Sequence, residues 1–328
     1  MSASALTTLA AVVAVVVVIG WWLYAGPGPV ARHDGATTVI LRQGAGLPEI
    51  ASSLGRAHVI HSAAIFMAAT QITGAAKHLK AGEYEFASRG SMASVIDEIR
   101  RGEVVHHTVT IPEGLTSEQV VDVLMSDDIL TGAAPVPPEG AVLPETYEVR
   151  RGEDRSAVLQ RMMDARDLLL RTLWAQRRQD LPLQTPEQAV ILASIVEKET
   201  GLADERPRVA AVFINRLQRG IRLGSDPTVI YGLTGGKPLG RGIRQSELLG
   251  PTPYNTYVIA GLPPGPICNP GRAALAAALD PPHTDELYFV ASGSGGHVFA
   301  STLEQHQKNV EHWRGVERQK IAAATGGR

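Results

Sequence analysis

An uncharged apolar segment near the start of the chain restricts where the rest of it can fold. No charged residue occurs from Leu6 to Tyr24, and valine and alanine dominate the centre of this stretch. As a helix it would rise about 28 Å, close to the hydrocarbon thickness of a bilayer. Trp21, Trp22 and Tyr24 stand where an aromatic belt forms at a membrane interface. We therefore expect residues 1–25 to be a single transmembrane anchor, with lipid along Leu6 to Tyr24.

A cleaved signal peptide is the alternative interpretation of this segment. Its apolar run is longer than the usual apolar core of a signal peptide, and no clear cleavage site with small residues follows Tyr24. We therefore expect the anchor to be retained. Its orientation does not follow from its flanks, because no lysine or arginine precedes it.

Turn residues and changes of periodicity divide the rest of the chain. Gly26-Pro27-Gly28-Pro29 predicts a short, stiff spacer. Strand-like and helix-like patterns then alternate, first in a small region and then in a larger one. The fold class that we expect is α+β. The predicted divisions are an anchor over 1–25, a linker over 26–36, a small strand–helix module over 37–108, a larger mixed domain over 109–320 and a tail over 321–328.

Charge and cysteine content argue against several classes of function. The 328 residues carry a formal net charge of −2 with well-mixed signs, so we expect no nucleic-acid partner, which would need a basic patch. Cys268 is the single cysteine, and we expect it to be a small buried side chain. His297 and His306 lack the spacing of metal ligands. We expect no metal and no cofactor.

A helix that ends at Glu199 carries the strongest catalytic signal. With about 100° of rotation per residue, Leu192, Ile195 and Val196 form an apolar face, and Glu199 falls inside it. A carboxyl group there loses hydration, which raises its pKa, and a protonated carboxyl group is what a general acid requires. The alternative is that Glu199 marks the end of the core stripe and reaches water.

The same helix carries a second glutamate in a different position. Ser194, Glu197 and Lys198 fill the polar side, opposite the apolar face. We expect this side to be solvated and Glu197 to have no role in chemistry.

Aromatic and amide residues cluster downstream of this helix. Tyr231, Tyr254, Asn255 and Tyr257 combine flat rings with hydrogen-bonding groups. Such a combination suits a sugar-binding cleft, because pyranose faces stack on rings and hydroxyl groups take hydrogen bonds. Ordinary packing at the edge of a core is the alternative.

Several ordered blocks between Ile111 and Trp313 resemble the endolytic murein transglycosylase family, also called YceG-like. The blocks are Ala193–Thr200, Glu205-Arg206, Val212–Leu217, Leu223–Gly232, Tyr254–Tyr257, Gly261–Ile267, Asn269–Gly271, Tyr288–Val290 and Gly296–Phe299. Two departures occur: an aromatic-rich stretch is missing before Pro144-Glu145-Thr146, and Cys268 replaces a commoner small or apolar residue. The resemblance implies a LysM-like module over 37–108 and a catalytic domain over 109–320.

The resemblance also implies a reaction and a set of site residues. The family cleaves the β-1,4 bond after N-acetylmuramic acid (MurNAc) in peptidoglycan without water and leaves a 1,6-anhydro end. Glu199 matches the family's catalytic glutamate and would act first as acid and then as base. Residues assigned by resemblance to shaping the substrate cleft are Asp226, Thr228, Tyr231, Tyr254 and Asn255.

Two other functions stay open beside the lytic transglycosylase. One is a peptidoglycan hydrolase in which Asp226 activates a water molecule, and the other is a non-catalytic scaffold that binds the cell wall. The resemblance implies peptidoglycan strands as substrate and association with cell-wall synthases. It places the protein in the inner (plasma) membrane as a single-pass protein, with the catalytic domain on the periplasmic side.

Overall fold

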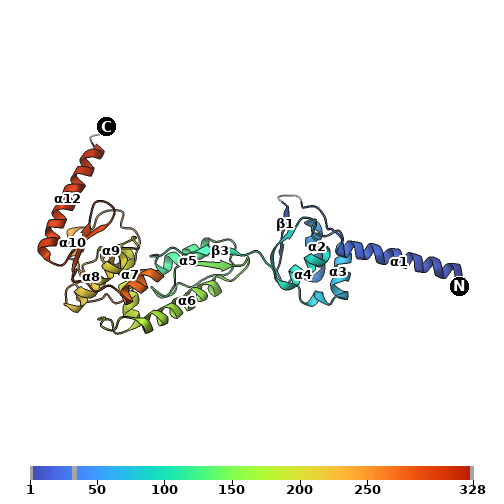
Figure 1. Cartoon of the computed structure of the whole chain (residues 1–328), viewed down its shortest axis with the longest axis horizontal. Coiled ribbons are helices and arrows are strands. Elements are labelled where there is room, and N and C mark those ends of the chain that lie inside the picture. Colours follow the sequence, from blue (N-terminus) through green and yellow to red (C-terminus); the bar gives the residue numbers. More distant parts are fainter. Residues whose placement is uncertain (1–2, 32–34, 326–328) are drawn as a thin grey trace. The chain divides into compact units, whose positions relative to one another are not determined.

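The computed structural model describes residues 3–31 and 35–325, which form two compact units. The first contains the described residues up to 108 together with 129–131 and 148–153. The second contains 109–128, 132–147 and the described residues from 154 onward. Figure 1 shows both, coloured along the sequence. Each unit is described by itself below.

The first unit begins with the apolar helix α1 (Ala3–Ala25). Its segment Thr7–Ala25 is the one stretch in the described residues that is long and apolar enough to cross a membrane. The side chains along it lie open, with Trp21 68% and Trp22 56% exposed. An apolar helix without protein cover is compatible with a membrane anchor.

A small α+β module follows in the same unit. Its elements are β1 (Ala36–Leu41), α2 (Leu47–Arg56), α3 (Ala63–Ile72), the short 3₁₀ helix η1 (Ala75–Lys77), β2 (Gly82–Ala87) and α4 (Met92–Arg101). β1 and β2 pair antiparallel, with Val39 opposite Tyr84. Leu54, Phe66 and Tyr84 are fully buried between the strands and the helices. The order strand–helix–helix–strand forms one core, and the LysM-like assignment of this module stays a prediction.

The Gly-Pro segment after α1 lies against this module. The Gly28 backbone N–H donates to the Arg89 carbonyl (3.1 Å), and the Arg89 N–H donates to the Pro29 carbonyl (3.0 Å). A Cβ on Gly28 would lie 2.1 Å from the Gly90 carbonyl oxygen, so only glycine permits this approach. Residues 32–34 of the predicted linker lie outside the described residues. The spacer is stiff because it is hydrogen-bonded to the module, rather than because of its prolines alone.

The larger part of the chain is mainly helical. Its elements are β3 (His107–Thr110), α5 (Ser117–Ser126), β4 (Thr146–Val149), α6 (Arg155–Gln176), α7 (Pro186–Glu199), α8 (Arg206–Gln218), α9 (Asp226–Thr234), α10 (Gln245–Leu248), α11 (Arg272–Leu279), β5 (Tyr288–Ala291), β6 (His297–Ala300) and α12 (Leu303–Thr325). β3 pairs with β4, and β5 pairs antiparallel with β6. The predicted mixture of helix and sheet is confirmed, with helices dominant.

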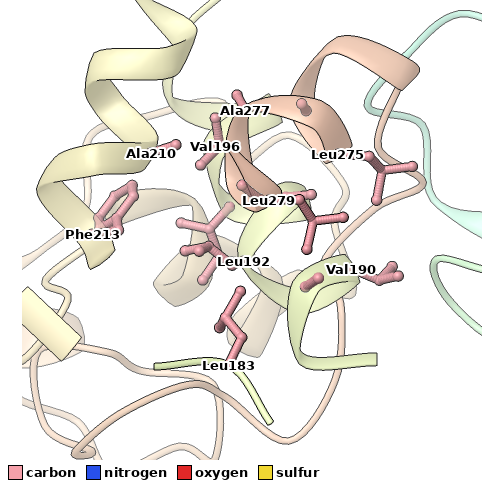
Figure 2. Packing of buried hydrophobic residues seen from close by; sticks show 14 of the residues in the cluster. Leu183, Val190, Leu192, Val196, Ala210, Phe213, Leu275, Ala277 and Leu279 are labelled. Carbon is pink, nitrogen blue, oxygen red and sulfur yellow. The ribbon is translucent and has the colours of Figure 1, made fainter. Parts of the chain in front are cut away.

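Helix α7 runs through the centre of the core (Figure 2). Leu192 and Val196 pack against Phe213 of α8 and Leu279 of α11. Thr185 caps the helix by accepting a hydrogen bond from the Gln188 N–H. Every residue from 189 to 196 is buried, so α7 is enclosed on all sides over this stretch.

The expected polar side of α7 is therefore wrong at Ser194. Ser194 is fully buried, donates to the Ile191 carbonyl (2.7 Å) and accepts from the Ile267 N–H (3.0 Å). A loop more than 70 residues further along the chain covers this side. Cys268 belongs to that loop and is a buried free thiol, as expected.

The end of the chain is helical beyond residue 320. Helix α12 continues through Thr325, so residues 321–325 of the predicted tail are helical. Residues 326–328 lie outside the described residues.

Candidate active site

Glu199 is the last residue of α7, where the buried stretch of the helix ends. The residue as a whole is half-buried, and its carboxyl group lies among closely packed protein atoms. The Ser225 hydroxyl donates a hydrogen bond of 2.5 Å to Glu199 Oε1. Ser225 stands at the N-cap position of α9, yet its side chain makes no capping bond to that helix. The Ser225 hydroxyl is therefore directed to the Glu199 carboxyl group in place of the backbone.

The pKa of Glu199 is raised to about 7. Desolvation among closely packed protein atoms is the largest cause, and the negative charge of Asp226 adds to it. The Ser225 hydrogen bond and the positive charges of His297 and Arg216 oppose the rise in pKa. A carboxyl group with a pKa near 7 has both its protonated and its ionised form available at neutral pH, as proton transfer in two directions requires.

Two buried threonines hold Ser225 in place. The Thr228 hydroxyl donates to the Ser225 carbonyl (2.6 Å), and the Ser225 N–H donates to the Thr256 hydroxyl (2.9 Å). The hydroxyl oxygens of Thr228 and Thr256 lie 2.8 Å apart. All three residues are buried. Thr228 thus lies behind Ser225 and orients it, and its hydroxyl is already engaged within the protein.

Asp226 supplies a second carboxylate beside Glu199. It is exposed, at the first turn of α9, and its Oδ1 accepts a hydrogen bond of 2.7 Å from the Tyr257 hydroxyl. Burial is the main cause that raises the pKa of Tyr257, which keeps this phenol protonated as a donor. The two carboxyl groups therefore have different surroundings, one desolvated and one open to solvent.

Arg216 brings a half-buried positive charge to the same region. Its guanidinium donates from Nε to the Leu287 carbonyl (2.6 Å) and from Nη1 to the Leu223 carbonyl (2.5 Å). Burial lowers the pKa of Arg216. These two bonds fix the guanidinium between α8 and the segments before α9 and β5.

His297 is held by a second glutamate. Glu205 Oε1 accepts from the His297 N–H (2.7 Å), and Glu205 Oε2 lies 2.7 Å from His297 Nδ1. A Cβ on Gly296 would lie 2.5 Å from Glu205 Oε1. Glycine at 296 is thus needed for the close pairing, and the pairing places the His297 ring near Glu199.

The two predicted tyrosines lie together at the other end of α9. The ring centroids of Tyr231 and Tyr254 are 4.8 Å apart, and both residues are half-buried. The Tyr231 hydroxyl donates to Glu139 Oε2 (3.3 Å). Asn255 is fully buried beside them, and its amide nitrogen donates to the carbonyls of Glu247 and Leu248 at the end of α10 and of Gly250 in the following loop. Asn255 therefore organises the loop that presents Tyr254.

Glu139 is a carboxyl group that the sequence interpretation missed. Its Oε1 accepts from the Ser117 N–H (2.9 Å) and from the Asn269 amide (3.3 Å). Burial raises the pKa of Glu139. The sequence held one signal, since Glu139 is the one acid in a proline-rich loop and precedes a glycine.

The expectation of a solvated Glu197 is wrong. Its side chain is only 6% exposed, accepts a hydrogen bond from the Gly271 N–H (2.9 Å) and lies 3.6 Å from Arg206 Nη2. Burial raises the pKa of Glu197 also. The loop at 269–271 crosses the last turn of α7 and excludes water from this side. Glu197 thus joins the loop to α8.

Comparison with known proteins places the chain in a family. A sequence model of the YceG-like family matches residues 39–312. An endolytic murein transglycosylase of Bacillus subtilis (strain 168) is 27% identical over 324 residues, 88% of this chain and 88% of that protein. An endolytic murein transglycosylase of Streptococcus pneumoniae serotype 2 (strain D39) is 29% identical over 326 residues. That match covers 84% of this chain and 58% of the relative, so the chain spans little more than half of that protein.

A solved structure supports the same assignment. The crystal structure of a YceG-like protein from Listeria monocytogenes is similar to this chain with a TM-score of 0.53 and 29% sequence identity. The similarity covers 84% of this chain and 98% of that one. Family, relatives and fold agree over most of the sequence, and the chain belongs to the YceG-like family.

Proposed function

We propose that this protein is a membrane-anchored lytic transglycosylase that cuts peptidoglycan strands internally. It cleaves the β-1,4 bond between MurNAc and N-acetylglucosamine (GlcNAc) in nascent strands and leaves 1,6-anhydroMurNAc ends, which terminates or trims elongation. The observation that carries the proposal is the Glu199 carboxyl group, desolvated, hydrogen-bonded to Ser225 and with a pKa raised to about 7. Family membership and the names of the relatives support the same class of reaction.

The proposed reaction needs one carboxyl group in two roles. Protonated Glu199 gives its proton to the glycosidic oxygen as the bond to the MurNAc anomeric carbon breaks, and GlcNAc leaves with a free hydroxyl. The Glu199 carboxylate then takes the proton from the C6 hydroxyl of MurNAc as that oxygen bonds to the anomeric carbon. Glu199 ends protonated, and no water is consumed. Acid and base roles alternate on one group, whose pKa suits both.

Neighbouring residues serve these two steps in different ways. Ser225 donates to the carboxylate after the first transfer, while the charge of Asp226 favours the protonated form before it. We assign Thr228 and Asn255 to the support of the site, since their polar groups bond within the protein. Tyr231 and Tyr254 offer partly exposed rings that suit a pyranose face.

A hydrolase that uses water is the second candidate. It is favoured by one observation: Asp226 is an exposed carboxylate near Glu199, oriented by the Tyr257 hydroxyl. In that reaction Asp226 would take a proton from water, and the product would carry a reducing end. Two carboxyl groups on either side of the sugar are the arrangement that such hydrolysis uses.

Product analysis decides between these reactions. The full chain in detergent would be incubated with purified peptidoglycan beside Glu199→Gln, with Glu118→Gln at an exposed site as the matched control. We expect anhydro ends from the wild type and from Glu118→Gln, and none from Glu199→Gln. Reducing ends would support the hydrolase and make Asp226 the next residue to change. The absence of cleavage at every pH tested would leave a non-catalytic wall-binding role.

The proposed location and organisation follow from the same reasoning. α1 would anchor the chain by one span in the inner (plasma) membrane, with the catalytic domain on the periplasmic side, where peptidoglycan lies. We retain the divisions at 1–25, 26–36, 37–108, 109–320 and 321–328 as proposed functional parts. Association with cell-wall synthases belongs to the same proposal and is supported by the proposed action on nascent strands.

A further inference from the structure

The module of the first unit is joined closely to the end of α1. α1 packs against α3 and α4, and Tyr24 contacts the core of the module. The Trp22 ring stacks on the His61 ring with centroids 6.4 Å apart. Together with the Gly28–Arg89 hydrogen bond, these contacts keep the surface around Tyr24 beside the end of the anchor.

Two adjoining hollows open on this surface. The first, of about 460 Å³, is lined in part by Tyr24, Thr73, Asp97 and Arg100. The second, of about 660 Å³, shares Arg100 with the first. Its lining is four basic residues with one histidine and one leucine: Lys77, His78, Leu79, Lys80, Arg100 and Arg101. We call the second one the basic hollow. It adjoins the hollow that Tyr24, at the end of α1, lines.

A core tyrosine fixes the walls of the basic hollow. The hydroxyl of Tyr84, which is fully buried, lies 2.8 Å from the Lys80 carbonyl and 3.3 Å from the Ile99 carbonyl. The Lys80 N–H donates to the Ile99 carbonyl (3.3 Å), and Lys80 Nζ donates to the Arg101 carbonyl (2.8 Å). The segment 77–80 is thus held against the end of α4, which brings two groups of basic residues face to face.

Part of this positive charge is already balanced. Asp97 pairs with Arg100 (2.7 Å) and with Arg101 (3.0 Å), and Arg101 also pairs with Glu103 (2.9 Å). Arginines in the last turn of a helix also stabilise its C-terminus. Neither ion pairing nor the C-terminus of α4 accounts for the positive charge of Lys77. This residue is exposed and has no carboxylate partner among the described residues. The hollow therefore keeps an excess of positive charge.

An apolar side chain stands open on the same surface. Ile72, at the end of α3, is 86% exposed, and the next residue, Thr73, lines the first hollow. An exposed isoleucine near basic residues is an arrangement found where a protein lies on a bilayer interface.

We propose that the basic hollow binds the phosphate groups of anionic phospholipids in the bilayer that α1 crosses. Lys77, Lys80 and Arg100 would contact the phosphate oxygens, and Ile72 would enter the interface beside them. Ammonium and guanidinium groups form charge-assisted hydrogen bonds with phosphate. The inference rests on the anchoring role proposed for α1 and is independent of the reaction at Glu199.

Hydrogen exchange of the full chain in lipid nanodiscs tests this site. One set of discs would contain phosphatidylcholine alone, and the other an equal mixture with anionic phosphatidylglycerol. Each basic residue near an anionic surface contributes a factor of about five in affinity. We therefore expect amides of residues 72–80 and 96–102 to exchange at least about fivefold more slowly in the anionic discs.

Variants assign any such protection to the basic hollow. Lys77→Gln should reduce the difference between the discs, and its combination with Lys80→Gln should reduce it further, whereas Arg56→Gln on α2 of the same unit should retain it in full. Equal exchange of the wild type in both discs would overturn the proposal, as would full protection in the double variant. An equal effect of inorganic phosphate in phosphatidylcholine discs would overturn the lipid as the source.

The same measurement tests separately whether α1 crosses the bilayer. Peptides from α1 should be protected in both kinds of disc if the helix crosses the bilayer. Loss of that protection would overturn the anchor and this inference together. Because no turnover is measured, neither result depends on the proposed transglycosylase reaction.

Discussion

The last turn of α7 has two sides, and each carries a desolvated glutamate. Glu197 faces Arg206 and the Gly271 N–H, while Glu199 faces the Ser225 hydroxyl. Burial raises the pKa of both groups. Glu197 is nevertheless held by a loop N–H and a cation, whereas Glu199 is bonded to a hydroxyl group and lies beside the exposed carboxylate of Asp226. A raised pKa therefore does not identify a catalytic acid, and the type of partner separates the two glutamates.

The largest effect expected from this comparison is the loss of turnover in Glu199→Gln. Glutamine keeps the shape of the side chain and removes its proton transfer, so the rate should fall by about 10³ or more. Release of muropeptides from purified peptidoglycan would measure it. A variant that keeps more than a tenth of wild-type activity would remove Glu199 as the catalytic acid.

Glu197→Ala should act on stability instead. It leaves the guanidinium of Arg206 buried, and the one carboxylate that remains near it among the described residues is Glu113, at 3.9 Å. Loss of one partner of a buried pair costs about 3 kcal/mol, so the midpoint of thermal unfolding should drop by several degrees. At a temperature where the Glu197→Ala protein is folded, it should still cleave peptidoglycan. A stable but inactive Glu197→Ala protein would contradict the distinction drawn here.

The pH dependence of stability gives a third, smaller difference. The pKa of Glu199 lies at about 7 when folded, against 4.5 for an ordinary glutamate. The contribution of Glu199 to the free energy of unfolding is largest below pH 4.5, where the group is protonated in both states. This contribution is lost as the pH rises through 7. Partial exposure reduces the cost of the ionised form to about 2 kcal/mol.

Glu199→Gln avoids this cost and should therefore unfold at a higher temperature than the wild type at pH 8, with the difference shrinking as the pH falls through this range. Calorimetry across this range checks the trend. A difference that grows toward acid pH would show that Glu199 is not desolvated.

Ser225→Ala should have the smallest effect of this series and should change the pH profile. The Ser225 hydrogen bond lowers the pKa of Glu199, so its removal raises that pKa further. A hydrogen bond to a charged group is worth about 1.5 kcal/mol, or about one pH unit. The alkaline limb of the plot of rate against pH should therefore move to a pH about one unit higher. Thr131→Ala, in the first unit, should leave the profile in place.

Periodicity predicted some of this site and failed at other parts for a definable reason. It placed Glu199 among apolar neighbours because local helical geometry fixes which residues share a face. It failed for Ser194 and Glu197 because it assumes that the opposite face meets water. The loop at 267–271 covers that face from far along the chain. Contacts of such sequence separation leave no trace in the local pattern.

The partners of the site residues show the same limit. Thr228 and Asn255 were associated with the site by resemblance. In the structure their polar groups form hydrogen bonds within the protein. Ser225 was visible within a matching block, yet nothing in the local sequence indicates that its hydroxyl reaches Glu199 rather than capping α9. Residue types are readable in sequence, whereas the direction of a side chain is decided by packing.

The bonded junction between Gly28 and Arg89 has a mechanical consequence. Two backbone hydrogen bonds and the close approach of Gly28 to Gly90 restrict rotation between α1 and the module. Rotation of α1 about its own axis is therefore transmitted as torque to the module. A pull on the module is likewise carried into the helix as a shear load. Gly28→Ala would loosen this coupling without changing any charge.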